Sequence, residues 1–298
     1  MVRRWFTGRT IIPLLFLAPA IIALLIFVYL PVVENFYYSL FRWSAIDPTL
    51  RFVGLENYRR LLSDPIVLRS VINNVLYAVI SVAFQVYLAL VLAAILESGV
   101  ISRRLAAFFR SALFLPSVLA ITVIGVTWKL MYSPEIGVIN QVLRAIGLGS
   151  LARPWLGLEN TAIYAIIGVS QWQWTGYMMI LFIVAIQAIP RELFESATID
   201  GANRIQQFFH ITVPSVRETT LVNLAVTVIG AFKVFDIVWV MTAGGPNHAS
   251  EVLGNYMYRV GFRNDEMGYA SAVAALIFVI TFILTFIQLR IGRTGKEA

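Results

Sequence analysis

Long apolar blocks constrain the fold of this chain more than any other feature of its sequence. Four of them exceed the roughly 20 residues that cross a hydrocarbon core as a helix, and they are Ile11–Val33, Val71–Leu96, Thr161–Ile189 and Met267–Leu289. Two further blocks are weaker, because one contains Pro116 and the other contains Lys233 and Asp236. We therefore predict an all-α integral membrane protein, a single domain over residues 1–298, with six spans near residues 11–33, 71–96, 111–131, 161–189, 217–241 and 267–289.

The composition supports the membrane class. Hydrophobic residues make up 59% of the chain and charged residues 13%, against roughly 45–50% and about 25% in soluble domains. The sequence contains no cysteine, which excludes disulfides and thiolate metal sites. The first block is longer than the roughly 7–15 apolar residues of a signal peptide, so we expect it to be a retained helix. The net charge of +7 fits a membrane bias, and we expect no nucleic-acid partner.

Lysine and arginine are distributed unevenly between the two sets of loops. Six spans place both termini on one side of the membrane, and the loops there carry these residues at about twice the density of the opposite loops. The segment Arg51–Arg69, in the longest opposite loop, works against this bias. We expect both termini to be cytoplasmic.

The stretch between the fourth and fifth blocks differs from its surroundings. Residues 190–214 place charges, amides and a glycine between two apolar blocks. Pro190 suits a first helical position, and Asp200-Gly201 is expected to break the helix because glycine permits a positive φ. The pattern predicts two short amphipathic helices outside the membrane, which suit a groove on a partner protein. A plain loop with helices at the membrane interface is the alternative that these residues leave open.

The spacing inside this stretch resembles the EAA loop of ABC importer permeases. That pattern runs Glu-Ala-Ala, three residues, Gly, nine residues, Ile, one residue, Leu-Pro. The matching residues are Glu195, Ser196, Ala197, Gly201, Ile211, Val213 and Pro214, with Asp200 and Ala202 beside the glycine. Ser196 replaces an alanine and Val213 replaces a leucine. Other segments, such as FVGLENYRRLLSDP and FKVFDIVWVMTAGGP, are similar to the sugar-type branch, the maltose and glycerol-phosphate group, and to its first permease partner.

The resemblance implies a fold, a set of partners and a role for the loop. It implies the type I importer permease fold, in the inner (plasma) membrane of a prokaryote, with a cytoplasmic coupling helix in residues 190–214 that docks on a separate ATPase subunit. The residues assigned to this coupling are Glu195, Ser196, Ala197, Asp200, Gly201, Ala202 and Pro214. It also implies a second permease subunit, two ATP-binding subunits, an extracytoplasmic solute-binding protein and a sugar substrate. Because the sequence has no Gly-x-x-x-x-Gly-Lys-Ser/Thr phosphate loop, ATP and Mg are expected on the partner subunits and no cofactor on this chain.

Two ionisable residues lie in the fifth block, where burial of each costs roughly 2.5–3.5 kcal/mol. Lys233 and Asp236 are three positions apart, which predicts that they share one helix face. Either they form an ion pair within the helix, with Lys233 extended toward the interface, or they bind sugar hydroxyls in the pore. The resemblance favours the second, because in sugar permeases this face of the penultimate span contributes to the substrate site.

The fourth block contains the aromatic sequence SQWQWTGY. Trp172, Trp174 and Tyr177 are predicted to stack on the apolar faces of a sugar ring, while the neighbouring glutamines bind its hydroxyls. The alternative is an aromatic belt at the membrane interface, where Trp and Tyr collect. We expect Gln85 and Asn223, in other blocks, to form hydrogen bonds between helices rather than to bind a ligand.

These observations favour a permease that imports a sugar or an oligosaccharide. An importer of the same type for a phosphorylated polyol such as glycerol phosphate is the first alternative, with Lys233 facing the anion and Asp236 arguing against it. An ion-coupled secondary transporter would use the same two residues as a proton relay, but it predicts inverted repeats, and none is visible in the sequence. An integral-membrane enzyme would need clustered acids, whereas Asp47, Glu56 and Asp64 are scattered. We expect neither a catalytic nor a metal site.

Overall fold

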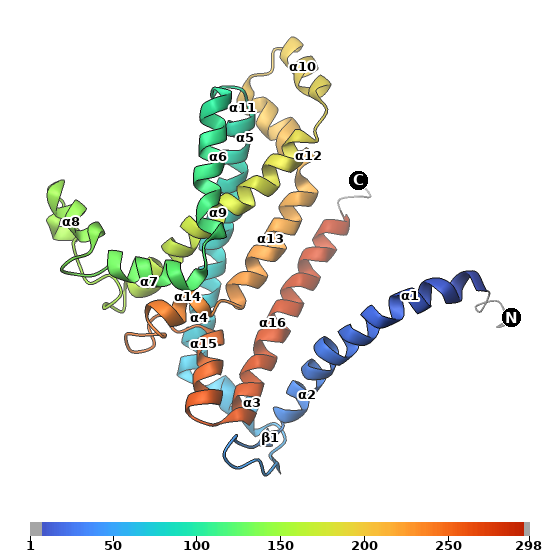
Figure 1. Cartoon of the computed structure of the whole chain (residues 1–298), viewed down its shortest axis with the longest axis vertical. Helices are drawn as coiled ribbons and strands as arrows, with labels where there is room; N and C mark the ends of the chain where they lie inside the picture. The colour runs from blue at the N-terminus through green and yellow to red at the C-terminus, as the bar shows by residue number, and fades with distance from the viewer. Residues whose placement is uncertain (1–7, 295–298) are drawn as a thin grey trace. The chain divides into compact units, whose positions relative to one another are not determined.

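The computed structural model describes residues 8–294, which are mostly helical. They divide into two compact units, whose helices and strands are labelled in Figure 1. The first unit runs over Met1–Ser63 and Met257–Leu276, and the second over Asp64–Tyr256 and Ile277–Ala298. The candidate site lies entirely within the second unit.

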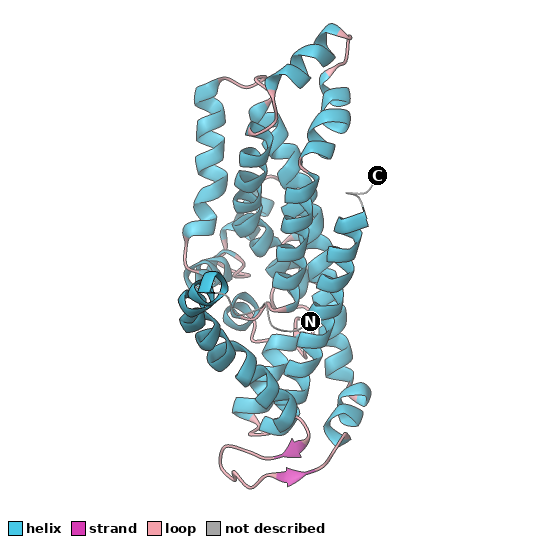
Figure 2. Cartoon of the chain, turned by 90° about the vertical axis from the view of Figure 1, so that its right-hand side faces the viewer, coloured by secondary structure: helices cyan, strands magenta, loops and turns pink. Residues whose placement is uncertain are grey.

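The first unit combines the N-terminal apolar helix with a short hairpin. Its elements are α1 (Gly8–Leu24), the π-helical η1 (Leu25–Tyr29), α2 (Leu30–Tyr38), β1 (Phe41–Arg42), β2 (Arg51–Phe52), α3 (Glu56–Ser63), the last residues of α15 (Leu253–Tyr258), the π-helical η5 (Arg259–Arg263) and the start of α16 (Met267–Thr294). The two strands pair antiparallel with Phe41 opposite Phe52 (magenta in Figure 2). A Cβ on Gly268 would lie 1.9 Å from the carbonyl oxygen of Phe41, so α16 approaches the hairpin closely because residue 268 is glycine.

The second unit is a helical bundle with a short helical excursion, which is the stretch 190–214 between α9 and α13. Its elements, besides the ends of α15 and α16, are α4 (Pro65–Ser81), the π-helical η2 (Val82–Leu88), α5 (Ala89–Glu97), α6 (Arg103–Val118), α7 (Ile121–Met131), α8 (Val138–Ala145), the 3₁₀ turn η3 (Gly149–Leu151), α9 (Ala162–Gln187), α10 (Arg191–Ile199), α11 (Arg204–Gln207), the π-helical η4 (Phe208–Thr212), α12 (Val213–Ser215), α13 (Arg217–Phe232) and α14 (Asp236–Met241). Helix α9 packs on α5, α6 and η2, and α13 packs on α4 and η2.

The core of this bundle is built around α9. Phe182, Met179 and Ala93 are fully buried between α9 and α5. Beside this cluster, a Cβ on Gly176 would lie 1.8 Å from the carbonyl oxygen of Leu113 in α6. Helices that pack inside a membrane use small residues in this way, because close backbone approach replaces the hydrophobic driving force that water provides.

Four helical runs are long and apolar enough to cross a membrane: Leu15–Tyr38, Pro65–Glu97, Ala162–Gln187 and Met267–Gln288. They agree with the first, second, fourth and sixth predicted spans. The other two predicted spans are not continuous helices in the structure. One is divided between α6 and α7, which are bent by 101°, and the other is divided between α13 and α14.

The bend between α6 and α7 follows from Pro116. Proline has no N–H to continue the helical hydrogen bonds, and α6 ends two residues later at Val118. Leu119 and Ala120 are extended, with ψ angles of 144° and 131°, before α7 begins. The segment predicted as a span near 111–131 is therefore divided between two helices that differ in direction.

Candidate functional site

A mostly apolar cavity with a few polar side chains opens where α13 ends and α14 begins. Its volume is about 290 Å³. The residues that line it are Tyr77, Ser81, Gln85, Ile121, Ser170, Trp174, Tyr177, Met178, Val226, Thr227, Gly230, Ala231, Lys233, Val234, Phe235, Asp236 and Ile237. Four of the five predicted substrate residues are among them: Trp174, Tyr177, Lys233 and Asp236. The structure thus brings together residues from α4, η2, α7, α9 and the broken fifth block.

The break itself is stabilised from another helix. The amide of Asn74, buried in α4, donates a 2.7 Å hydrogen bond to the carbonyl oxygen of Ala231, and its oxygen accepts a 2.9 Å bond from the N–H of Leu253. Gly254 permits the chain to pass close to the break, because a Cβ there would lie 2.8 Å from the carbonyl oxygen of Val234. Non-helical backbone at membrane depth is tolerated where protein buries it or a cavity borders it, and both conditions hold here.

The break corrects the prediction that Lys233 and Asp236 share one face of a helix. Lys233 is the C-cap that follows α13, with φ −95° and ψ 1°, and Phe235 leaves the helical region, with φ −143° and ψ −63°. Asp236 is the first residue of α14. The helical spacing rule fails because three residues of non-helical chain separate the two elements, yet both side chains still line the cavity.

The two tryptophans of SQWQWTGY lie in different surroundings. Trp174 lines the cavity and forms an edge-to-face pair with Tyr177, with ring centroids 6.1 Å apart. Trp172 does not line it; its side chain is 45% exposed and contacts Trp128 of α7, with centroids 5.4 Å apart. Residues two positions apart point in different directions on a helix, so α9 presents the two indoles to different environments.

The buried side-chain amides beside the cavity differ in whether they form hydrogen bonds. Gln85 donates a 2.9 Å hydrogen bond to Gln171, which in turn donates to the hydroxyl of Ser81 at 3.1 Å. Gln85 therefore links η2 to α9, as predicted. Asn223 is fully buried in α13, and within the described residues neither its amide nitrogen nor its oxygen has a hydrogen-bond partner. The expectation of an interhelical bond at Asn223 is wrong in this structure. One turn on, the Thr227 hydroxyl also lacks a partner among the described residues and lies beside the cavity.

Sequence reasoning missed several residues of this site, including Tyr77 and Asn74. The signal that could have found them is the pair Asn73-Asn74, because adjacent amides inside an apolar block are costly unless they bond to something specific. Asn73 donates to the carbonyl oxygens of Ala249 and Glu251 at 3.0 and 2.8 Å. The two asparagines thus attach α4 to both chain segments that border the break.

The stretch 190–214 folds as the predicted helix–turn–helix. Helix α10 begins at Arg191, with Pro190 as its N-cap rather than its first helical residue. Gly201 ends the helix with φ +80°, and the N–H of Ala202 bonds back to Ala197 at 2.8 Å. Asn203 then begins α11 with a reciprocal capping box to Gln206. The turn at Asp200-Gly201 is confirmed, and strong local capping explains why the sequence predicts it.

Most of this helical excursion is exposed. Every residue from Arg191 to Ile211 is exposed or half-buried, and Ile199 is 87% exposed. Phe194 and Phe208 anchor the excursion on the core of α5 and α9. A second cavity, of about 290 Å³, lies on its surface and is lined by Ala197, Asp200, Gly201, Ala202, Gln206, Gln207, His210 and Ile211. Three other residues assigned to coupling, Glu195, Ser196 and Pro214, are exposed outside it.

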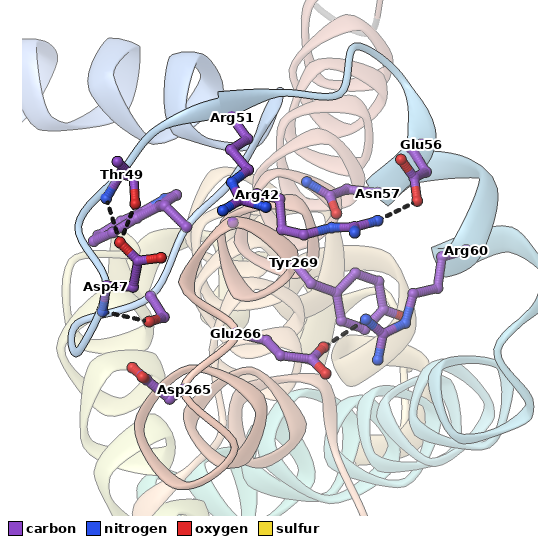
Figure 3. Close-up of a pocket in the computed structure, with 13 residues that line it drawn as sticks. Arg42, Asp47, Thr49, Arg51, Glu56, Asn57, Arg60, Asp265, Glu266 and Tyr269 are labelled. Atoms are coloured by element: carbon purple, nitrogen blue, oxygen red, sulfur yellow. Dashed lines mark hydrogen bonds and ion pairs between the residues drawn. The ribbon is translucent and has the colours of Figure 1, made fainter.

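A third cavity, of about 480 Å³, lies within the first unit and is lined by charged side chains (Figure 3). Arg42 pairs with Glu56, and Arg60 pairs with Glu266 while lying 4.0 Å above the ring of Tyr269. Most of its charges are therefore already neutralised, and it contains none of the predicted substrate residues. Within the part of the chain that the structure describes, no group of three or more His, Cys, Asp or Glu side chains could hold a metal ion.

Comparisons with known proteins agree with this geometry. Residues 67–294 match the family model described as "Binding-protein-dependent transport system inner membrane component". The chain is 50% identical over 287 residues to the probable ABC transporter permease protein YurN of Bacillus subtilis, covering 96% of this chain and 98% of that protein. It is 34% identical over 287 residues to the trehalose/maltose transport system permease protein MalF of Thermococcus litoralis, covering 95% and 94%.

The fold also has a solved counterpart. A chain of a bacterial alginate ABC transporter, crystallised in complex with an alginate pentasaccharide-bound periplasmic protein, superposes with a TM-score of 0.84 at 23% identity, covering 97% of this chain and 96% of that one. That likeness shows the permease fold. The family match begins in α4 and extends through α13 and α14 to the end of α16. The chain therefore belongs to the family of inner-membrane components of binding-protein-dependent ABC transport systems.

Proposed function

We propose that this chain is the transmembrane pore subunit of an ATP-driven importer that takes up a sugar, an oligosaccharide or a glycoside. The observation that carries the proposal is the cavity at the break between α13 and α14. It combines an indole and a phenol, from Trp174 and Tyr177, with the charged groups of Lys233 and Asp236. A flat apolar wall with few polar groups suits an amphipathic ligand such as a pyranose. The name of the Thermococcus relative, which refers to trehalose and maltose, supports the same substrate class.

The exposed excursion is proposed to couple this pore to ATP hydrolysis. Its turn, from Ala197 to Ala202, presents small side chains around a shallow cavity, and a helical knob of this shape fits a groove on a partner. The proposed partners are two ATP-binding subunits that carry ATP and Mg, a second permease subunit and an extracytoplasmic binding protein that delivers the sugar.

We further propose six spans in a single membrane domain, with both termini in the cytoplasm. In this arrangement the α6–α7 pair would form the third span and the α13–α14 pair the fifth. The excess of arginine and lysine on the side of the excursion supports the orientation. The lipid-facing surface would include the many exposed apolar side chains of α1, η1 and α2, such as Phe16 of α1 and Phe27 of η1.

The alternatives are weaker on specific grounds. For a phosphorylated polyol, Asp236 would stand beside the anion in the same cavity, where like charges repel. An ion-coupled carrier would need no ATPase-docking excursion, and membership of a binding-protein-dependent family argues against it.

The test is to co-express the chain with its neighbouring transporter subunits, reconstitute the complex, and measure ATPase activity with the binding protein and candidate sugars. Stimulation by a sugar that disappears in Glu195→Ala and Gly201→Pro complexes, while the subunits still co-purify, is the expected result. Full stimulation in both variants would overturn the coupling role. Stimulation by glycerol phosphate alone would favour the polyol alternative.

A further inference from the structure

A fourth cavity lies where the helical excursion meets the bundle. Its volume is about 600 Å³. One wall comes from the ends of α5 and α9, including Ala94, Glu97 and Gln187, and the other comes from the excursion, including Arg191, Phe194 and Arg204. Figure 1 shows α10 and α11 at this end of the second unit, next to the end of α5.

The cavity contains more positive than negative charge. Its single carboxylate, Glu97, is paired with Arg110 of α6 and also accepts a 3.2 Å hydrogen bond from Gln187. Arg204 donates one N–H to the carbonyl oxygen of Ser98, which leaves its other donors available. The Arg191 side chain makes no hydrogen bond or ion pair with any residue between 8 and 294. Two guanidinium groups therefore face a space in which the only acid is already neutralised.

The cavity lies at the ends of two long apolar helices. Pro65–Glu97 and Ala162–Gln187 are both long enough to cross a membrane, and the hydrogen bond between Glu97 and Gln187 joins their ends at the same level. The lining also includes the apolar side chains of Ile186, just before Gln187, and Ile189, just after it. The cavity thus combines apolar and basic side chains at the ends of two apolar helices.

This cavity is distinct from the one on the exposed turn. The two linings share only Gln207. Residues assigned to ATPase coupling, such as Ala197 and Gly201, border the turn cavity and not this one. A ligand here would therefore lie between the excursion and the ends of α5 and α9, leaving the coupling surface accessible.

We propose that this cavity binds the phosphate of an anionic phospholipid headgroup, with Arg191 and Arg204 as its ligands. Basic pockets between transmembrane helices at the membrane surface bind phosphate headgroups, and arginine matches phosphate oxygens with paired N–H donors. The glycerol and first acyl carbons would lie against the apolar part of the lining. Because Arg191 belongs to α10 and Arg204 to α11, one phosphate would join both helices of the excursion to the end of α5.

The test uses the assembled transporter in nanodiscs and in detergent. Binding of dioleoyl phosphatidylglycerol is measured by native mass spectrometry, with dioleoyl phosphatidylcholine as the neutral reference. The Arg191→Gln/Arg204→Gln variant is expected to bind phosphatidylglycerol about 30-fold more weakly. Arg191→Gln alone, which breaks no described contact, should account for part of that loss, and Arg191→Lys should restore most of it. Arg103→Gln, a neutral substitution at the start of α6 outside the cavity, is the matched control and should bind as the parent does.

Three outcomes would overturn the lipid assignment. Equal binding of phosphatidylglycerol by the double variant and the parent would show that the arginines hold no headgroup. Displacement of the lipid by millimolar inorganic phosphate would identify free phosphate as the ligand. Loss of the ATPase subunits from the double variant, with lipid binding unchanged, would assign the arginines to an acidic partner surface instead.

Discussion

The side-chain amide of Asn74 donates a 2.7 Å hydrogen bond to the backbone carbonyl oxygen of Ala231, 157 positions later in the chain. This carbonyl is the one that a continuous helix would pair with the N–H of residue 235. The same side chain accepts from the N–H of Leu253. One buried amide thus stabilises both the end of α13 and the start of α15, which passes beside it. It therefore helps to maintain the cavity that Lys233 and Asp236 line.

Replacing Asn74 with leucine should destabilise the protein. Two buried backbone groups, on Ala231 and Leu253, would lose their partner, at about 1–3 kcal/mol each. Asn74→Asp keeps the acceptor for Leu253 but turns a second acceptor toward the carbonyl oxygen of Ala231 and buries a charge, so it should also destabilise the protein. The measurement is the thermal midpoint of the purified protein in detergent. The control is Gln141→Ala, which removes one exposed hydrogen bond and should change stability by less than about 0.5 kcal/mol. Equal midpoints for Asn74→Leu and the control would contradict this account of the break.

Gly176→Ala should disrupt the packing of α6 on α9. The new methyl group would lie 1.8 Å from the carbonyl oxygen of Leu113, and a backbone atom cannot rotate away. We expect a loss of at least about 1–3 kcal/mol, seen as a lower folded yield and thermal midpoint. Gly230→Ala is the matched control, because a Cβ there meets nothing within 4 Å and alanine favours a helix by about 1 kcal/mol. A control that unfolds as readily as Gly176→Ala would count against the close approach.

Gly201 is needed for its backbone angle rather than for space. Its φ is +80°, and a Cβ added to it would have no other atom of this chain within 4 Å. Asn tolerates this region better than a β-branched residue does, so Gly201→Asn should retain most of the sugar-stimulated ATPase activity and Gly201→Val should lose most of it. Equal loss in both would mean that the partner surface, and not the turn, requires glycine.

The sequence predicted the parts of the structure that depend on local chemistry. Apolar length alone predicts four spans, and the positive φ that glycine permits predicts the turn at Asp200-Gly201. The breaks were not predictable in the same way. Pro116 was visible, but the 101° bend also depends on the extended residues that follow it. The end of α13 depends on Asn74, whose partner lies too far along the chain for any local pattern to reveal.

In the candidate site, too, the sequence predicts what depends on residue type, whereas the geometry depends on contacts between distant residues. Lys233 and Asp236 were found because charge inside an apolar block is costly, whereas their geometry was mistaken because helical spacing was assumed across the break. Trp172 and Trp174 could not be separated by residue type. The structure separates them through the rotation of α9, and this difference can be tested directly.

Lys233→Met should impair transport without affecting sugar capture by the binding protein. A charged hydrogen bond contributes about 1.5–3 kcal/mol, so we expect uptake at low sugar concentration to fall roughly 10- to 100-fold. Uptake into proteoliposomes is the measurement, with the Lys233→Arg complex as the charge-retaining comparison. Unchanged uptake in Lys233→Met would remove this residue from the substrate path.

The tryptophan pair provides the sharpest test of the cavity. Trp174 lines it and Trp172 contacts Trp128 outside it. An aromatic contact contributes about 0.5–1.5 kcal/mol beyond area burial, so Trp174→Leu should lower uptake about two- to tenfold, chiefly through a higher KM for the delivered sugar. Trp172→Leu is the matched variant, two positions away on the same helix, and should transport normally if only cavity residues bind the sugar. The reverse pattern, with Trp172→Leu impaired and Trp174→Leu normal, would move the substrate path to the α7 face of α9 and restore Trp172 as a sugar-binding residue.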